Sequence, residues 1–466
     1  MLYLSNLFRK KQIGDLLKKK DGGGVQLKQT LGAFDLIMLG VGAIVGTGIF
    51  ILPGTVAATH AGPAIIFSFV IAAFVCALAG MCYSEFSSAI PVTGSAYTYG
   101  YIVFGEIIAW LVGWALVLEY GLASASVATG WSSYLISLLE GLNIAIPHSF
   151  SGPFNPAEGT YINLPAVLIV LAISYLLSRG MQESAKINKI MVFVKVGVIL
   201  LFIVVGVFYV KPDNWQPFMP FGFDGVLAGA ALVFFAFLGF DAVSSAAEEV
   251  KNPQKNLPIG IIGSLVVCSL LYITISLVLT GIAPYTDLNV SNPVSFVIQL
   301  VGQDWIAGII SLGAVTGMMT VILVMLYGGS RLIFAIARDG LLPKSLFKVN
   351  PKNQTPVINT WVFGIAVAFC AGFIPLSKLA ELVNMGTLLA FMIVSIGIIY
   401  LRKNKDIPSG GFKVPLFPVL PILSFFACLF LISQLSINTW IACGIWFVIG
   451  LILYFIYGRK HSRLNN

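Results

Sequence analysis

The first long apolar run of this chain, at about residues 33–58, contains the stretch Val41-Gly42-Ala43-Ile44-Val45-Gly46-Thr47-Gly48-Ile49-Phe50. The run is long enough to cross a bilayer, which takes about 20 helical residues, yet three glycines and a threonine lie in its middle. Glycine weakens a helix interior by about 1 kcal/mol relative to alanine and admits backbone angles that open the helix. The stretch therefore predicts a broken membrane helix, with one half ending near Ile44 and the next beginning near Gly48. The alternative is an intact, glycine-rich helix packed tightly on a neighbour.

The two ends of such a break carry opposite partial charges. Carbonyl groups at the end of the first half are negative, and N–H groups at the start of the second half are positive. Freed backbone groups are tolerated in a membrane only where they face protein or a wet cavity. A zwitterion fits this arrangement, with its ammonium group on the carbonyls and its carboxylate on the N–H groups. The break is therefore a candidate substrate site of the kind found in secondary transporters.

Composition indicates a membrane protein. Of the 466 residues, 58% are hydrophobic and only 10% are charged, whereas soluble domains carry about 25% charged residues. The six cysteines all lie in apolar runs without a CxxC pair, and the three histidines are scattered. This usage favours buried, unpaired cysteines and no metal site. We expect an all-α polytopic membrane protein without a nucleic-acid partner, because the location of the basic residues accounts for the net charge of +8.

Twelve apolar runs predict twelve membrane spans, of which the last two are the easiest to miscount. They lie at about residues 33–58, 62–84, 105–129, 162–178, 190–210, 225–246, 258–282, 304–330, 357–373, 379–401, 416–432 and 436–457.

The same runs divide the chain into segments. We expect a cytoplasmic tail over residues 1–32, a ten-helix core over 33–401, a cytoplasmic linker over 402–415, two further helices within 416–457 and a cytoplasmic tail over 458–466. With the N-terminus inside, 24 of the 27 Lys and Arg residues fall on the cytoplasmic side, as the positive-inside rule requires. Both termini are therefore expected in the cytoplasm.

A second irregularity lies in the sixth span. Gly239 interrupts the aromatic run that begins at Phe234, and Asp241 follows it near mid-membrane, where a free carboxylate costs several kcal/mol. An aspartate that opens a second half-helix would be stabilised by the N–H groups of that half. The alternative is an ordinary helix with Asp241 in a polar cavity. Breaks five spans apart predict two five-span repeats of opposite direction, over about 33–210 and 225–401.

Several further charged or small residues have two interpretations each. Glu119 in the third span is either a functional acid or a protonated structural one, and Glu85 and Glu106 are expected at the membrane interface. The link at residues 86–97 is either a packed re-entrant piece or a plain loop. The remaining charges at cytoplasmic helix ends form either an inner gate or a solvated surface; they are Glu248, Glu249, Arg331, Arg338 and Asp339.

Lys195 is the one basic residue placed inside a span. Burial disfavours its charged form, whereas carbonyls at the end of the first half-helix, near Gly42 and Ala43, would favour it. Opposed effects of this kind produce a group whose protonation can change when the local structure opens. Protonated Lys195 would hold the fifth span against the first half-helix, and deprotonated Lys195 would release it. The alternative is a lysine that extends toward the cytoplasmic interface.

Three ordered motifs resemble the signatures of the amino acid–polyamine–organocation (APC) superfamily of transporters. They are Gly42-Ala43-Ile44-Val45-Gly46-Thr47-Gly48-Ile49-Phe50, Pro91-Val92-Thr93-Gly94-Ser95-Ala96-Tyr97-Thr98-Tyr99, and Phe237-Leu238-Gly239-Phe240-Asp241 with the following Ala247-Glu248-Glu249-Val250-Lys251-Asn252-Pro253. Within the superfamily the chain most resembles bacterial members of the cationic amino acid transporter family. The resemblance implies a LeuT-type fold, with spans 1–5 and 6–10 as inverted repeats, helices 1 and 6 broken, and two appended helices.

The resemblance also implies roles for individual residues. Thr47 and Gly48 would bind the substrate carboxylate through their N–H groups, and Lys195 would occupy the place of a sodium ion in sodium-coupled relatives. The carbonyls of Ile44, Phe235 and Leu238 would accept the ammonium group, Phe235 and Ala236 would line the pocket, and Met325 would face the substrate side chain. A bulky thioether at Met325 leaves room only for small side chains; the alternative there is ordinary core packing.

We therefore expect an amino acid permease in the plasma membrane that takes up small neutral L-amino acids such as Ala, Ser or Thr by alternating access, with the proton as coupling ion and no other cofactor. Lys195 and Glu119 are the candidate proton-coupling residues, and the expected partners are the amino acid and membrane lipids. The rivals are exchange of amino acids or polyamines without net proton movement, and a nutrient sensor. A membrane enzyme would be favoured by a nucleophile–base pair or a metal cluster at a span end, and the sequence shows neither.

Overall fold

The computed structural model describes residues 9–10, 29–91, 95–180, 185–350, 355–404 and 411–465. Within these ranges the chain folds into helices and no strand is present, apart from four isolated bridges. Most of the expected N-terminal tail and part of the 402–415 linker lie outside the described residues. Eight helical segments are long and apolar enough to cross a membrane, and four more apolar helices are shorter. The described part of the chain is thus that of an all-α polytopic membrane protein.

The first apolar run is broken at the predicted place. Helix α3 spans Ala33–Ile44, and α4 spans Thr47–Phe50 after a gap at Val45 and Gly46. Gly46 has φ −144° and ψ −138°, which is outside the region that most residues adopt. Three short elements continue the run toward the second span: α5 (Leu52–Val56), η2 (Ala57–Ala61) and η3 (Gly62–Ala64).

The sixth apolar run is broken as well. Helix α11 spans Gly222–Val233 and tightens into the 3-10 turn η7 (Phe234–Phe237). Leu238 is extended, and Gly239 has φ +109°, a conformation that glycine adopts without strain. The chain becomes helical again in α12 (Ala242–Ser245) and η8 (Ala247–Glu249), with Asp241 at the N-cap of α12.

The remaining elements are mostly long helices. They are α6 (Ile65–Ala89), α7 (Ser95–Val103), α8 (Glu106–Gly141), η4 (His148–Phe150), α9 (Leu164–Ser178), α10 (Ala185–Gly206), η5 (Val207–Tyr209), η6 (Pro212–Trp215), α13 (Pro253–Ile282), η9 (Tyr285–Leu288), α14 (Pro293–Leu300), α15 (Asp304–Arg338), η10 (Lys344–Phe347), α16 (Val357–Phe373), α17 (Leu376–Lys403), α18 (Val419–Ser433), α19 (Ile437–Leu453), η11 (Tyr454–Gly458), α20 (Arg459–His461) and η12 (Arg463–Asn465).

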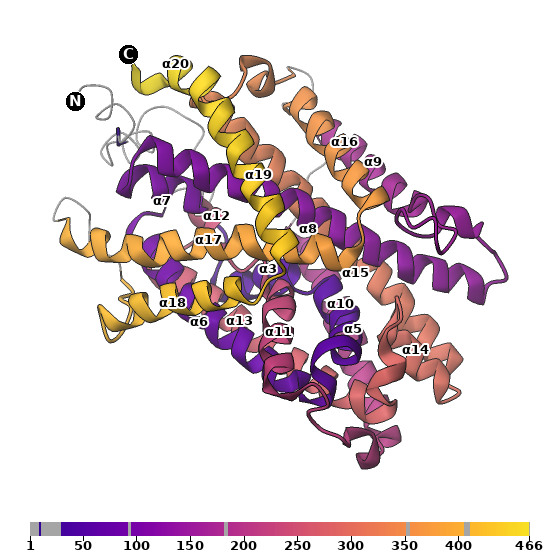
Figure 1. Ribbon diagram of the computed structural model, residues 1–466. Helices are drawn as coiled ribbons and strands as arrows, with labels where there is room; N and C mark the ends of the chain where they lie inside the picture. Colours follow the sequence, from indigo (N-terminus) through magenta and orange to yellow (C-terminus); the bar gives the residue numbers. More distant parts are fainter. Residues whose placement is uncertain are drawn as a thin grey trace.

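The helices pack in pairs around the two breaks. Helix α8 packs against α15 and α17, α13 against α6 and α3, and α16 against α9 (Figure 1). Small residues allow the closest of these contacts: a Cβ atom on Gly40 of α3 would lie 2.5 Å from the Ser264 hydroxyl of α13, and one on Gly260 of α13 would lie 2.5 Å from Leu36. Close backbone approach is the usual basis of helix packing in membranes.

The link between the second and third spans is a packed segment. Helix α6 continues to Ala89, and α7 begins at Ser95. Tyr97, Tyr99 and Tyr101 of α7 are buried, and α7 packs on α8 and α17. A plain loop is therefore excluded for residues 95–97, while residues 92–94 lie outside the described part.

The described residues of the two chain ends lie together. The Arg9 guanidinium donates to the carbonyl of Leu464 at 2.8 Å. By contrast, α19 exposes Ile441, Ile445 and Val448 along its length. Such an apolar outer face suits lipid.

Candidate functional site

The two helix breaks touch each other in the interior. A Cβ atom on Gly48 would lie 2.5 Å from the Cα atom of Ala236, and one on Gly239 would lie 3.0 Å from the carbonyl of Ala43. Each break therefore has a glycine where the backbone of the other break comes closest, because a larger residue would clash there. This contact places the end of α3, the start of α4 and the turn η7 around one point.

The N–H end of the site is the start of α4. The first hydrogen bond of this half is donated by Ile49 to the carbonyl of Gly46, so the N–H groups of Gly46, Thr47 and Gly48 precede the hydrogen-bonded helix and carry its positive partial charge. Thr47 is fully buried and donates its hydroxyl to the Met318 sulfur at 3.6 Å. This anchors α4 to α15.

The carbonyl end of the site is held by a tyrosine. The Tyr272 hydroxyl of α13 lies 2.6 Å from the carbonyl of Ala236 and 3.2 Å from that of Ile44, so it bridges the two breaks. The carbonyl of Phe235 accepts the N–H of Leu238 at 3.3 Å. Tyr272 was not among the site residues expected from sequence, although a lone tyrosine in an apolar span signals a hydroxyl that needs a buried partner.

All seven residues expected to bind substrate are buried. Thr47 and Gly48 belong to α4, Ile44 ends α3, Phe235 and Ala236 lie in η7, Leu238 follows it, and Met325 lies in α15. Val321, one turn from Met325 on the same helix, lies 3.4 Å from where a Cβ atom on Gly46 would be. This brings α15 against the first break. A substrate could reach these residues only after the surrounding helices move.

Lys195 lies deeper than the sequence analysis expected. Its helix, α10, begins at Ala185, ten residues earlier, and the side chain is fully buried. Its ammonium donates to the carbonyl of Gly42 at 2.6 Å and to that of Val45 at 3.2 Å. Snorkelling toward the interface is therefore excluded. The contact is the one expected for a lysine that holds α10 to the end of α3, where unpaired carbonyls concentrate negative partial charge.

Gly42 allows this contact. A Cβ atom on Gly42 would lie 2.9 Å from Val192 and 3.0 Å from the Asn188 side chain. Asn188, Val192 and Lys195 lie on one face of α10 at helical spacing, so that face packs directly on the backbone of α3.

A second set of buried polar residues surrounds Glu119 and Asp241. Both carboxyl groups are buried, in α8 and at the N-cap of α12, and they lie close enough for their charges to interact. Thr387 of α17 lies beside Glu119, and Tyr120 lies beside Asp241. One oxygen of each carboxyl group has no hydrogen-bond partner among the described residues. Groups of this kind concentrate at functional sites.

Glu85 and Glu106 lie near the ends of α6 and α8, where the sequence places them, and both side chains are buried within the protein. Glu85 is buried, and Arg402 pairs with both of its carboxylate oxygens at 2.7 Å while the N–H of Val414 donates to one of them. Glu106 is fully buried and accepts hydrogen bonds from the hydroxyls of Tyr101, Tyr454 and Ser462. Apart from Tyr101, these donors come from segments far away in the sequence, which is why position within a span did not predict burial.

The charged residues considered for an inner gate contact different parts of the structure. Asp339 accepts the Tyr97 hydroxyl at 2.7 Å, and Arg331 lies over the ring of Tyr327. The carbonyl of Glu249 accepts the N–H groups of Thr30 and Leu31, which ties the start of the first run to the end of the sixth. The side chain of Glu248 lies outside the described part. No ion pair joins Glu249, Arg331, Arg338 or Asp339 to one another in the described structure.

Comparison with known proteins shows the family to which the chain belongs. The family model described as "Amino acid permease" matches residues 31–457. The chain is 54% identical to the methylthioribose transporter of Bacillus subtilis, over 99% of this chain and all of the relative. It is 53% identical to the branched-chain amino acid permease BcaP of the same organism, over 99% of both chains. It is also 37% identical to human cationic amino acid transporter 4, over 83% of this chain and 61% of that protein. The chain therefore belongs to the amino acid permease family of the APC superfamily.

Proposed function

We propose that this protein takes up neutral L-amino acids with small side chains, such as Ala, Ser or Thr, across the plasma membrane by alternating access coupled to protons. The observation that carries the proposal is the contact between the two helix breaks. It brings the N–H end of α4 and the carbonyl ends of α3 and η7 to one buried point. An α-amino acid is the simplest ligand with one carboxylate and one ammonium group to match them.

The proposed binding mode uses backbone groups for the part shared by all amino acids. The N–H groups of Thr47 and Gly48 take the carboxylate, and the carbonyls of Ile44, Phe235 and Leu238 take the ammonium. Ala236 and Phe235 line the pocket. Met325 limits the size of the substrate side chain, because it is a buried thioether of α15 one turn from Val321, which packs beside the first break.

The proposed architecture is the twelve-span LeuT-type fold, with both termini in the cytoplasm. Helix lengths support two repeats of five spans. The third and eighth spans, α8 and α15, have 36 and 35 residues and pack on each other. The fourth and ninth, α9 and α16, have 15 and 17 residues and also form a pair. A short helix precedes each long one, α7 of 9 residues and α14 of 8.

Lys195 supplies the proposed coupling. Its charged form holds α10 to the carbonyls of Gly42 and Val45, and loss of the proton weakens that hold. A proton then biases the equilibrium between closed and inward-open arrangements of α3. Glu119 is the second candidate for the coupling group, because it is buried and one of its oxygens has no hydrogen-bond partner among the described residues.

A second candidate substrate has a specific observation in its favour. One relative is named a methylthioribose transporter and another a branched-chain amino acid permease, at 54% and 53% identity. Sequence identity over the whole chain therefore does not decide whether the substrate is a sugar thioether or an amino acid. Methylthioribose has neither a carboxylate nor an ammonium group, so the two candidates differ in the groups that the breaks would bind.

Counterflow into proteoliposomes separates the candidates. Preloaded vesicles are offered labelled Ala with competing Ser, Leu, Arg, methylthioribose, the amine formed by decarboxylating Ala, and N-acetyl-Ala. We expect competition by small neutral amino acids and none by the last three compounds. Full competition by the amine or by N-acetyl-Ala would refute the zwitterion site, and competition by methylthioribose alone would establish the sugar thioether. Repeating uptake with and without a pH gradient distinguishes proton-coupled transport from obligate exchange.

A further inference from the structure

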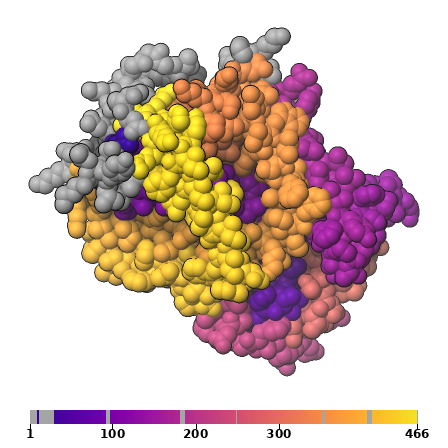
Figure 2. Space-filling model, turned by 45° about the horizontal axis from the view of Figure 1, so that its top comes forward, coloured from indigo at the N-terminus to yellow at the C-terminus, as the bar shows by residue number. Residues whose placement is uncertain are grey.

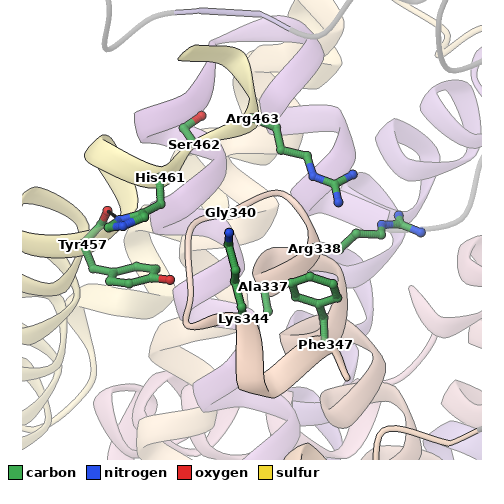
Figure 3. Close-up of a pocket in the computed structure, with 9 residues that line it drawn as sticks. All are labelled: Ala337, Arg338, Gly340, Lys344, Phe347, Tyr457, His461, Ser462 and Arg463. Carbon is green, nitrogen blue, oxygen red and sulfur yellow. Dashed lines mark hydrogen bonds between the residues drawn. The ribbon is translucent and has the colours of Figure 1, made fainter. Parts of the chain in front are cut away.

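The C-terminal segment encloses a basic cavity against the end of α15, far from the helix breaks in the sequence. Its volume is about 280 Å³, and its lining residues are Ala337, Arg338, Gly340, Lys344, Phe347, Tyr457, His461, Ser462 and Arg463. Figure 2 brings forward the face across which this C-terminal segment lies. Figure 3 shows Arg338 and Arg463 on one side of the cavity, Tyr457 and His461 on the other, and Lys344 between them.

Specific contacts build this cavity. Gly340 has φ +88°, and a Cβ atom on it would lie 2.1 Å from the carbonyl of His461, so the tail passes directly over the end of α15. The N–H of Arg463 donates to the carbonyl of Asp339 at 3.1 Å. The Ser462 hydroxyl is buried and donates to the buried carboxylate of Glu106. The tail is therefore held at three successive residues, and the cavity is part of the packed structure.

The basic side chains of the cavity, Arg338, Lys344 and Arg463, have no ion-pair partner among the residues that the structure describes. The neighbouring carboxylate, Asp339, is engaged by the Tyr97 hydroxyl at 2.7 Å. Three cations that line one cavity and form no ion pair with the described residues favour an anion, and guanidinium groups match the paired oxygens of a phosphate. Phe347 and the stacked rings of Tyr457 and His461, with centroids 4.2 Å apart, add apolar walls.

We propose that this cavity binds the phosphate group of a ligand at the cytoplasmic face, with Arg338, Lys344 and Arg463 as its contacts. An anionic phospholipid headgroup and a soluble phosphate compound share this chemistry. A basic pocket beside membrane helices on the cytoplasmic side suits the first source, and the apolar walls suit either the glycerol part of a lipid or the organic part of a soluble ester. Binding would fasten the C-terminal segment to α15.

The test is thermal stabilisation of the full-length protein, purified in an uncharged detergent. The probes are short-chain phosphatidylglycerol, short-chain phosphatidylcholine, inorganic phosphate and pyrophosphate, at constant ionic strength. The cavity variant carries Arg338→Gln, Lys344→Gln and Arg463→Gln. The matched control carries Lys348→Gln, Lys403→Gln and Lys460→Gln, which removes the same charge from exposed residues of the same end of the molecule that do not line the cavity.

We expect saturable stabilisation of the wild type and of the control, with half-saturation shifted about tenfold or more in the cavity variant. Stabilisation by phosphatidylglycerol alone identifies a lipid, and stabilisation by phosphate or pyrophosphate as well identifies a soluble ligand. The single change Arg463→Gln, at an exposed tail residue, repeats the comparison with less risk to folding. Absence of stabilisation of the wild type by any anionic probe would overturn the proposal, as would equal losses in the cavity and control variants.

Discussion

The two helix breaks have the same backbone plan and opposite charges. At the first break the carbonyls of Gly42 and Val45 are held by the ammonium of Lys195. At the second break the chain places a carboxylate, Asp241, at the start of the returning half-helix, and the carbonyl of Ala236 is held by a neutral hydroxyl from Tyr272.

This difference gives the two contacts different tasks: the Tyr272 contact fixes the breaks, and the Lys195 contact responds to protons. A hydroxyl holds a carbonyl in the same way at every physiological pH, so Tyr272 fixes the distance between the breaks. An ammonium group holds carbonyls strongly only while it is protonated, so the Lys195 contact is the one that a proton gradient can alter. The first break is therefore the expected moving part, and the second break is the expected fixed part.

The largest effect is expected from closing the gap between the breaks. Gly48→Ala places a Cβ atom 2.5 Å from the Cα atom of Ala236, and backbone cannot move aside cheaply. We expect a loss of about 1–3 kcal/mol in stability and a correspondingly large loss of substrate binding, measured by thermal shift with and without Ala. Gly444→Ala is the control, because a Cβ atom there meets nothing within 4 Å. Equal behaviour of the two variants would show that the breaks do not need their close contact.

A smaller effect is expected from removing the bridge between the breaks. Tyr272→Phe removes the one O–H group that two buried carbonyls share, at a cost of about 0.5–1.5 kcal/mol. We expect substrate affinity to fall by about tenfold and the response of uptake to a pH gradient to persist. The matched control is Tyr83→Phe, since the Tyr83 hydroxyl is buried without a partner among the described residues. Loss of the pH response in Tyr272→Phe would assign coupling to the second break instead.

The smallest effect is expected at the wall of the site. Met325→Ser shortens a buried side chain of α15 and should extend the substrate range toward larger or cationic amino acids by a few-fold in relative uptake, with little change for Ala. The measurement is the competition panel described above. If the well-folded variant keeps the wild-type profile, Met325 is an ordinary packing residue.

The sequence predicted those features of the fold that depend on neighbouring residues within one span. Glycines in an apolar run predicted the break between Ile44 and Thr47, and Gly239 predicted the second one. It failed where partners come from distant segments: the donors to Glu106 include Tyr454 and Ser462, more than 300 residues away. A single span therefore could not show that Glu106 is buried, nor that Tyr272 bridges two breaks.

The sequence predicted that Lys195 lies near the end of α3. It did not predict how far along α10, and so how deep in the protein, Lys195 lies. The apolar run suggested a start near residue 190, whereas α10 begins at Ala185 with polar residues included. Because the first turn of α10 contains polar residues, it is not part of the apolar run by which the span was predicted. Helix ends depend on packing and capping more than on hydrophobicity, so the depth of a charged residue becomes visible only in the folded helix.

The most direct test of the account compares two lysines of α10 that both tie it to α3. Lys195 holds the carbonyls of Gly42 and Val45 in the interior, and Lys189 pairs with Asp35 at a partly exposed position, where an ion pair contributes little. Lys195→Ala and Lys189→Ala are reconstituted side by side, with substrate binding followed by thermal shift and accumulation followed at imposed pH gradients. The account predicts that both variants bind substrate, that Lys189→Ala accumulates it like the wild type, and that Lys195→Ala does not accumulate it. Accumulation by Lys195→Ala at the wild-type level would contradict the account and make Glu119 the next residue to change.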